Sequence, residues 1–394
     1  MTPTELPHID PELATLAELG EARERSWVAT SDRGLEVLRY DEGFEVLRHP
    51  KLAKGPAWPH RLDIMGITEG PTRQQWDRML ISVEGAARTH LRVPLSRLLR
   101  PKQVEALRTV ARQVVDEILD EIEDPTDVDL MQQVCWKLPA RMYCHLVSAP
   151  FSQAETVARL SDSCVAPVLT ADLSRRQEHI DAFTEIFDFV QEHIDRRRSD
   201  PGDDFTSVMI EQQEAGMLTE QELLEEAVAL LIASIDNTVH QSALMLGELF
   251  ERPELLNRVA ADPALVVPAV EETIRFRPRF GTIFRLATED IELYDRTVPE
   301  GTWVFVSVRA AQRDPRKWEN PDVFDLDRPK TAPLMFGNGI YNCLGQHLAR
   351  IEIQELTSAL TERFPNARLS KDRAIRDTNA VTEVTELRAN LVAS

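Results

Sequence analysis

The sequence predicts a mainly α-helical fold with a smaller β region, and three observations support this fold class. The stretch from Ala86 to about Phe250 has helical patterning almost throughout. Short segments of strand type occur on both sides of it. Hydrophobic residues make up 43% and charged residues 28% of the 394 residues, a balance typical of globular proteins and too apolar for a disordered chain.

We expect one domain over residues 1–394, because no repeat, low-complexity tract or Gly/Ser linker divides the sequence. The expected domain has a β-containing N-terminal part at about 20–60 and a helical body at about 86–276. A C-terminal part that combines strands with a cysteine-containing loop follows at about 277–394.

The N-terminal part is expected to hold two short strands, at 27–30 and 35–40, because both segments alternate in polarity. A short helix from Asp41 to Arg48 follows and stops before Pro50. The segment from Gly55 to Met79 contains three prolines, three glycines and two tryptophans without clear periodicity. It predicts a long, partly ordered loop, and such loops are usually functional.

The helical body is expected to contain a long helix from about Glu220 to Arg252, which ends at Pro253. Thr219 and Glu222 form a capping-box pattern at its start. At 1.5 Å per residue this helix would be roughly 50 Å long, enough to cross a whole domain. Another helix is predicted from about Pro263 to Phe276.

Strands are predicted again in the C-terminal part, at 282–287, 291–293 and 303–308, with a turn at 299–301. A proline-rich stretch from Asp314 to Pro333 leads to the glycine-rich segment 336–339. A final helix is expected to begin near Leu344 and to end near Pro365.

The charge and cysteine content exclude several classes. Lys and Arg total 45 against 66 Asp and Glu, a net charge of −21, so we expect neither nucleic acid nor an anionic membrane as the main partner. Residues 1–16 have no basic n-region and no apolar core, so we expect no signal peptide. The sequence contains no apolar run of about 18 residues, so we also expect no membrane span. Four cysteines are too few for a disulfide framework, so the expected compartment is the cytoplasm.

The segment from Phe336 to Gly345 is the most informative. Cys343 lies just before a helix, where the helix macrodipole favours a thiolate. The two glycines before it allow backbone N–H groups to turn toward the sulfur and tune a metal-bound thiolate. Gly345 leaves room for a flat group against the helix, and Phe336 could screen the sulfur from water. The alternative is a buried structural cysteine beside a turn.

This segment resembles the haem-binding loop of the cytochrome P450 family, FGxGxHxCxGxxLAR, with Tyr341 in place of the family's usual His or Arg. The matching residues are Phe336, Gly337, Gly339, Cys343, Gly345, Leu348, Ala349 and Arg350. The resemblance implies haem b (iron protoporphyrin IX) with the Cys343 thiolate as its axial ligand. It also implies the P450 fold, with haem between a long central helix and the cysteine-loop helix, and the bacterial, soluble, ferredoxin-dependent type.

A second motif supports the resemblance. Glu272 and Arg275 lie three residues apart on one helix face and can pair. Their position about 70 residues before the cysteine resembles the family's ExxR element, and Arg328 resembles the arginine that completes its buried ionic triad. The implied role of the triad is structural, because it holds the cysteine loop. Removal of one member is expected to strand a buried charge.

Several arginines are implied to bind the haem propionates. Arg285 resembles the family's propionate arginine, and Arg88 and Arg92 occupy the place of the helical HxxxR motif, with Arg88 in place of the histidine. Two solvated arginines on an amphipathic helix are the alternative. A further propionate histidine is replaced by Pro333, and Tyr341 could supply a hydroxyl donor instead.

Polar residues interrupt the long helix after the apolar run 228–232. The segment 233–238 resembles the family's A-G-x-(D/E)-T-T element, which implies that Asp236 relays protons. Asn237 occupies the position of the family's alcohol; an amide can also donate and accept hydrogen bonds. Thr238 could substitute, but it lies about 100° further round the helix. A polar notch that is only hydrogen-bonded is the alternative.

By resemblance, the substrate pocket draws on the segments 55–79 and 165–169 and on residues of the long helix and of the segment after ExxR. The residues predicted to line it are Leu231, Ile232, Ile235, Arg279, Phe280 and Ile283. Most are apolar, which suits a hydrophobic small molecule. Arg279 and its neighbour Arg277 could hold a substrate carboxylate; alternatively, Arg279 pairs with a propionate or faces solvent.

The implied activity is that of a haem-thiolate monooxygenase, which inserts one oxygen atom from O₂ into a terpenoid, steroid or aromatic compound. No flavin or iron–sulfur signature is present. Electrons are therefore expected from a separate ferredoxin or flavodoxin and its NAD(P)H reductase, docked on arginines that include Arg97 and Arg100. Two alternatives remain: a peroxide-using or rearranging haem-thiolate enzyme, and a non-catalytic haem- or ligand-binding protein.

Overall fold

A computed structural model of the chain describes residues 6–393, which form two compact units. The first comprises 6–57, 267–343 and 376–383, and the second comprises 58–266, 344–375 and 384–393. The chain therefore passes between the units after residues 57, 266, 343, 375 and 383. The single domain over 1–394 stays a prediction, and the signal-peptide prediction for 1–16 lies partly outside the described residues.

A five-stranded sheet forms the centre of the first unit. Its strand order is β1 (Val28–Ser31), β2 (Gly34–Val37), β8 (Trp303–Ser307), β5 (Thr282–Ala287) and β3 (Leu52–Ala53). β2 and β8 are parallel, and the other neighbours are antiparallel. The bounds predicted for β5 and for β6 (Ile291–Leu293) are confirmed. The partner of β6, β7 (Arg296–Val298), was missed because Arg-Thr-Val lacks the apolar–polar–apolar alternation that Ile-Glu-Leu shows.

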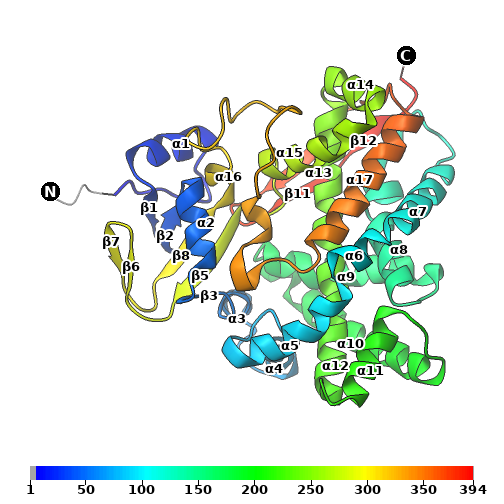
Figure 1. Cartoon of the computed structure of the whole chain (residues 1–394), viewed down its shortest axis with the longest axis horizontal. Helices are drawn as coiled ribbons and strands as arrows, with labels where there is room; N and C mark the ends of the chain where they lie inside the picture. Colours follow the sequence, from blue (N-terminus) through cyan, green and yellow to red (C-terminus); the bar gives the residue numbers. More distant parts are fainter. Residues whose placement is uncertain (1–5, 394) are drawn as a thin grey trace. The chain divides into compact units, whose positions relative to one another are not determined.

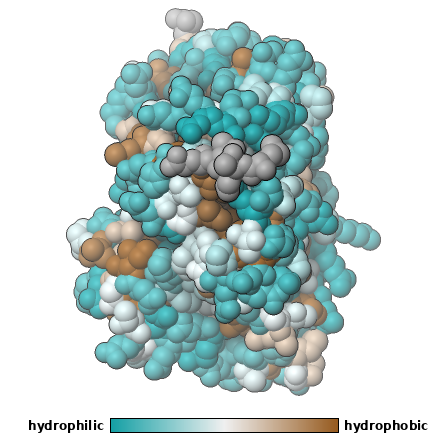
Figure 2. All heavy atoms as spheres, turned by 90° about the vertical axis from the view of Figure 1, so that its left-hand side faces the viewer, coloured by the Kyte–Doolittle hydropathy of each residue, from teal (hydrophilic) through white to brown (hydrophobic). Residues whose placement is uncertain are grey.

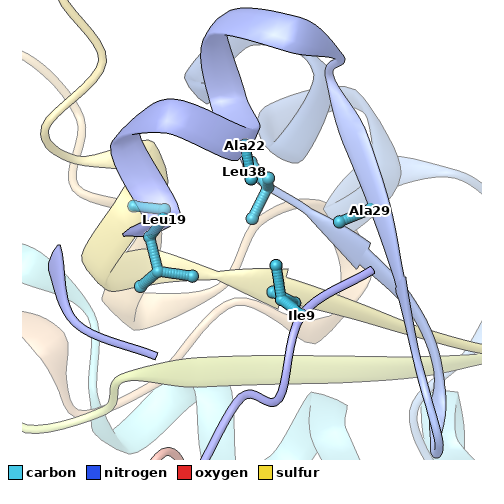
Figure 3. Close-up of a cluster of buried hydrophobic side chains, with 6 residues drawn as sticks. Ile9, Leu19, Ala22, Ala29 and Leu38 are labelled. Carbon is cyan, nitrogen blue, oxygen red and sulfur yellow. The ribbon is translucent and has the colours of Figure 1, made fainter. Parts of the chain in front are cut away.

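Helices cover part of this sheet. The first unit contains α1 (Leu16–Arg25), α2 (Tyr40–Arg48), α15 (Val266–Phe276, in this unit from Val267) and α16 (Val308–Ala311). A small apolar cluster of Ile9, Leu19, Ala22, Ala29 and Leu38 joins α1 to the sheet, and Figure 3 shows these side chains pointing toward one another. Apolar burial of this kind is the main favourable term in folding.

The second unit is mainly helical. Its helices are α3 (Ala57–Ile64), α4 (Pro71–Arg78), α5 (Gly85–Leu98), α6 (Pro101–Glu105), α7 (Arg108–Asp120), α8 (Lys137–Leu146), α9 (Ala154–Leu169), α10 (Arg176–Ser199), α11 (Phe205–Glu214), α12 (Glu220–Ser234), α13 (Asp236–Phe250), α14 (Pro253–Ala261) and α17 (Gln346–Arg363). Figure 1 shows α17 alongside α7, and α17 also contacts α13 and α14. The strands β4 (Val128–Asp129), β9 (Arg368–Leu369) and β12 (Arg388–Asn390) belong to this unit, and the residues of β10 (Ala374–Asp377) and β11 (Thr382–Glu386) are divided between the two units.

The long loop predicted for Gly55–Met79 is wrong, because the structure forms α3 and α4 there. Pro59 lies inside α3, and Trp76 is the only large apolar residue of α4, so neither segment shows a clear run of apolar residues at helical spacing. Gly70 precedes α4 with φ +92°, and Pro71 occupies its first position, where a missing N–H is harmless. The rings of Trp58 and Trp76, one from each helix, lie 4.8 Å apart.

The single helix predicted from Glu220 to Arg252 is also wrong in one respect. The capping box of Thr219 and Glu222 is confirmed, but the helix is interrupted at Ile235, which has φ −107° and ψ −72°. The Ser234 hydroxyl donates to the Leu230 carbonyl at 2.5 Å. This side-chain bond to residue i−4 competes with the backbone ladder and bends helices. The interruption coincides with the polar segment singled out in the sequence.

Among residues 6–393, none of the helices combines the length and the apolarity needed to span a membrane. On the face of the molecule drawn in Figure 2, hydrophilic residues predominate and hydrophobic residues form small, separate patches.

Glu352 is a buried carboxyl group in the middle of α17. Glu352 is 2% exposed, and its Oε2 has no hydrogen-bond partner among the described residues. Burial raises the pKa of Glu352 to about 8, because the charged form is poorly solvated there. At neutral pH the side chain is therefore mostly protonated in the folded protein.

We predict that Glu352→Gln removes a pH-dependent loss of stability. The folded pKa of about 8 exceeds the ordinary glutamate pKa of 4.5, so stability is fully present below about pH 4.5 and is lost as the pH rises to about 8. The difference in melting temperature between Glu352→Gln and wild type should therefore grow in favour of the variant from about pH 5 to 8. Glu362→Gln is the control, because Arg112 lowers the pKa of Glu362 and keeps it ionised over this range. If the difference in melting temperature between Glu352→Gln and wild type did not change with pH, the prediction would be contradicted.

Candidate functional site

The loop before Cys343 has a defined backbone. Two short 3₁₀ turns, Leu334–Phe336 and Gly339–Tyr341, precede the cysteine, and the Cys343 N–H donates to the Phe336 carbonyl at 2.8 Å. Cys343 is exposed, whereas the other three cysteines are buried. The loop therefore presents one thiol at its end, which contradicts the alternative of a buried structural cysteine.

The two glycines of the loop are required by its geometry. Gly337 and Gly339 have φ values of +69° and +64°, a region that favours glycine. A Cβ at Gly339 would approach the Arg48 Cα of α2 to 3.3 Å, so close packing also excludes a larger side chain. These positions match the glycines noted in the sequence pattern.

The structure brings the three predicted triad residues together within the first unit. The Glu272 carboxylate accepts two hydrogen bonds from Arg275, both at 2.7 Å, and one from Arg328 at 3.1 Å. The side chains are 4–7% exposed. The Asp325 N–H also donates to Glu272 at 2.9 Å. One buried carboxylate thus neutralises part of the charge of two buried arginines, which requires all members to be present.

Arg285 and Tyr341, predicted separately, lie against each other in the first unit. The Arg285 guanidinium carbon lies 4.9 Å from the centre of the Tyr341 ring, within the range of a cation–π contact. Arg285 is 1% exposed and donates to the carbonyls of Phe284, at 3.0 Å, and Leu47, at 3.5 Å. No local pattern predicts this contact, because 56 positions separate the two residues.

In the second unit, Arg88 on α5 is 5% exposed, so the alternative of a solvated arginine is wrong for it. It donates to the Leu80 carbonyl at 2.6 Å, while the Leu80 N–H donates to the Glu226 carboxyl at 2.8 Å. Burial raises the pKa of Glu226 to about 8. Arg92, one turn after Arg88, is half-buried.

The interrupted helix places the polar residues of the second unit in different environments. Asp236, the first residue of α13, is fully buried, and its Oδ1 lies 3.6 Å from the His240 Nε2. Asn237 is half-buried, and its Oδ1 has no hydrogen-bond partner among residues 6–393. Thr238 is buried, and its hydroxyl lies 3.5 Å from the Ser234 carbonyl. Asn237 is therefore better placed than Thr238 to bind a further polar group.

The predicted pocket residues of α12 do not form its open face. Leu231 and Ile235 are fully buried and Ile232 is 7% exposed, whereas Ala233 is exposed. Ala229 and Leu230, one turn earlier, are half-buried. Sequence reasoning missed this face, although a helical projection from Asn237 through positions i−4 and i−8 would have found it.

Arg279 is held inside the first unit and does not face solvent. It is 1% exposed, donates to the Thr382 carbonyl at 3.0 Å and lies 3.5 Å from the Glu383 carboxylate. Its neighbours Phe280 and Ile283 are half-buried apolar residues. The internal carboxylate therefore weakens the idea that Arg279 holds a substrate carboxylate.

Comparisons with known proteins agree with this geometry. A family model described as Cytochrome P450 matches residues 145–383. The chain is 33% identical to luteothin monooxygenase of Streptomyces thioluteus over 88% of this chain and 86% of that protein. This chain belongs to the cytochrome P450 family. It is also 32% identical to mycinamicin IV hydroxylase/epoxidase of Micromonospora griseorubida, over 84% and 82% of the two chains.

The fold agrees as well. The crystal structure of CalO2 matches with a TM-score of 0.89 at 23% identity, over 97% of this chain and 98% of that chain. P450 proteins bind haem through a cysteine thiolate, and Cys343 is the cysteine of the matching loop. The chain is therefore a P450 oxidoreductase of the monooxygenase type, and the non-catalytic alternative is not supported.

The residues of the chain fit this cofactor. Cys343 offers an exposed sulfur, the ligand type that P450 haem requires. A Cβ built at Gly345 would meet no protein atom within 4 Å other than its chain neighbours, so the space beside this residue is open. A flat macrocycle bound to the Cys343 sulfur needs open space of this kind beside Gly345.

We predict that Glu272→Ala destabilises the protein by about 3–5 kcal/mol, because Arg275 and Arg328 keep their charge without the buried carboxylate. The measurement is the yield and chemical unfolding of the holoprotein. Glu105→Ala removes an exposed ion pair with Arg108 and should change stability by about 1 kcal/mol or less. An equal loss of stability in the two variants would show that the buried triad contributes no more than an exposed ion pair.

We predict that Gly345→Leu lowers the haem content several-fold while the helical circular dichroism is retained. The backbone of Gly345 has φ −81°, so leucine introduces no strain, and its side chain would occupy the open space. Gly20→Leu on α1 is the control, because a Cβ there meets only the end of the Arg23 side chain, at 3.7 Å. A normal haem-to-protein ratio in Gly345→Leu would mean that haem does not use this space.

Proposed function

We propose that this P450 hydroxylates a hydrophobic small molecule of terpenoid, steroid or aromatic type with one oxygen atom from O₂. The observation that carries the proposal is the loop ending in Cys343, with its two left-handed glycines and exposed sulfur. Haem bound there supplies the activation of O₂, while the protein provides the thiolate, the orientation of the substrate and the protons.

Each of the two units contributes apolar side chains that support an apolar substrate. In the second unit, Ala229, Leu230 and Ala233 of α12 are apolar and partly or fully accessible, beside the polar Ser234. In the first unit, Phe280 and Ile283 are apolar and partly accessible. Two similar proteins are named for the oxidation of a single compound each, luteothin and mycinamicin IV, which supports a dedicated organic substrate here too.

We assign proton delivery to Asp236 and Asn237. A buried carboxyl group needs a partner or a task, because burial disfavours its charged form. The Asn237 amide carbonyl accepts no hydrogen bond from the described residues and can therefore accept one from a water molecule. Asn237 would then orient water in place of the family's threonine. The absence of that alcohol also favours a second candidate, a peroxide-using enzyme that needs no external proton delivery.

Further residues complete the proposed site. In the first unit, Arg285 and Tyr341 are proposed to bind a haem propionate, and Phe336 and Gly337 to shape the surroundings of the sulfur. In the second unit, Arg88 and Arg92 are proposed for the same task. The electron donor is proposed to be a separate ferredoxin or flavodoxin, for which the exposed Arg97 and Arg100 offer positive charge.

The proposed function predicts spin-state shifts and turnover that depend on Cys343. Ferric holoprotein titrated with neutral terpenoids, steroids and aromatics should shift from low spin toward high spin when a compound binds in the substrate site. Compounds that shift the spectrum should then be hydroxylated with NAD(P)H, a surrogate ferredoxin and its reductase.

Cys343→Ser should lose the thiolate spectrum of the ferrous carbon monoxide complex together with turnover. Turnover with hydrogen peroxide alone, and none with the ferredoxin system, would select the peroxide-using alternative. Shifts with carboxylic acids only would overturn the neutral, apolar substrate.

A further inference from the structure

His240 links the predicted catalytic acid to the C-terminal part of the second unit. It lies one turn after Asp236 on α13, with its Nε2 3.6 Å from the Asp236 Oδ1. On its other side, the backbone N–H of Val384 in β11 donates to the His240 Nδ1 at 3.2 Å. His240 is 5% exposed, and the Trp136 ring lies edge-on to it at 6.0 Å.

The contact with Val384 determines the protonation state of His240. A backbone N–H can only donate, so the Nδ1 atom must carry a lone pair and no proton. The single proton of the neutral imidazole is then on Nε2, the nitrogen nearest to Asp236. A doubly protonated ring would set two N–H groups against each other at Nδ1.

This tautomer also limits what His240 can do. A histidine that relays protons must accept at one ring nitrogen and release at the other. Here the Nδ1 lone pair is already engaged by the Val384 N–H, so His240 can donate a hydrogen bond but cannot pass protons through its ring. Its Nε2 lies 3.6 Å from an oxygen of a carboxyl group that is fully buried.

We infer that His240 is a positioning residue, which holds the Asp236 carboxylate in one orientation through its Nε2–H. This inference rests on the proposed role of Asp236 in proton delivery. The 3.6 Å separation is longer than a hydrogen bond in this structure, and catalytic contacts of this kind often shorten only when substrate is bound. The main-chain bond from Val384 keeps the imidazole from turning away.

Two other buried histidines provide internal comparisons. His193 Nε2 contacts the Val147 carbonyl at 2.7 Å, and its Nδ1 accepts from Arg196, so it also carries its proton on Nε2. His179 Nδ1 contacts the Cys164 carbonyl at 2.6 Å and therefore carries its proton on Nδ1. Burial lowers the pKa of both His179 and His193, which keeps them neutral. Neither contacts a catalytic carboxylate.

The first test reads the tautomer directly. Holoprotein with ¹⁵N-labelled histidine, studied by NMR as its diamagnetic ferrous carbon monoxide complex, should show His240 neutral with the proton on Nε2. The resonance is assigned by its loss in His240→Gln, and His179 should show the opposite tautomer. A proton on Nδ1, or a charged imidazolium, would overturn the inference whether or not the protein is a monooxygenase.

The second test measures product formed per NAD(P)H consumed, with a compound that shifts the spin state. His240→Leu should lower this coupling by about 10-fold, since it removes the donor to the acid. His240→Gln, which retains an N–H donor, should restore most of it. In an Asp236→Asn background the leucine substitution should have no further effect. An equal loss in both backgrounds, or no rescue by glutamine, would overturn the inference.

His193→Gln is the control for the loss of a buried histidine and should leave coupling unchanged. If no compound gives product with wild type, the proposed function fails, and the NMR result still decides the state of His240. If the leucine variant does not fold, the comparison of wild type with His240→Gln and the tautomer measurement remain decisive: strong uncoupling in His240→Gln would count against the inference.

Discussion

The buried carboxylate of Glu272 is the constraint on which the first unit depends. It accepts from Arg275, Arg328 and the Asp325 N–H. The two guanidinium groups extend the same network to main-chain carbonyls of the segment 319–323, which has no helix or strand of its own. Arginine side chains thus bind main-chain carbonyls that a helix or sheet would otherwise pair. The irregular segment 319–323 is therefore held by hydrogen bonds from two arginine side chains instead of by a helix or a sheet.

The same network leads to the start of the cysteine loop. The Gln312 side-chain amide donates to the carbonyls of Ile274 and Arg275 at the end of α15, and its oxygen accepts from the Leu334 N–H. Leu334 begins the turn that leads to Gly337 and then to Cys343. The exposed sulfur is thus connected to α15 by a short series of buried hydrogen bonds. Such pre-organisation places a ligand before the cofactor is bound.

Local patterns predicted most of this site, and contacts between distant residues account for what they did not predict. The glycine positions, the capping box of α12 and the bounds of β5 each depend on a few neighbouring residues. The partner of His240 is Val384, 144 positions away, and no local signal marks that pair. The short helices α3 and α4 were missed for a different reason, because neither carries a clear run of apolar residues at helical spacing.

The polar segment between α12 and α13 shows how a local conflict can be resolved by structure. Asp236 and His240 lie in a helix whose other residues are almost all buried, where unpaired polar groups are unfavourable. The interruption at Ile235 begins a new helix at Asp236, so the carboxyl group lies in a first helical turn, which the macrodipole makes favourable for an acid. His240, one turn later, offers it an N–H whose position is set by β11. The feature that makes the long helix irregular therefore also makes the burial of its acid tolerable. Sites that break a local rule with a compensating contact are those where function is expected.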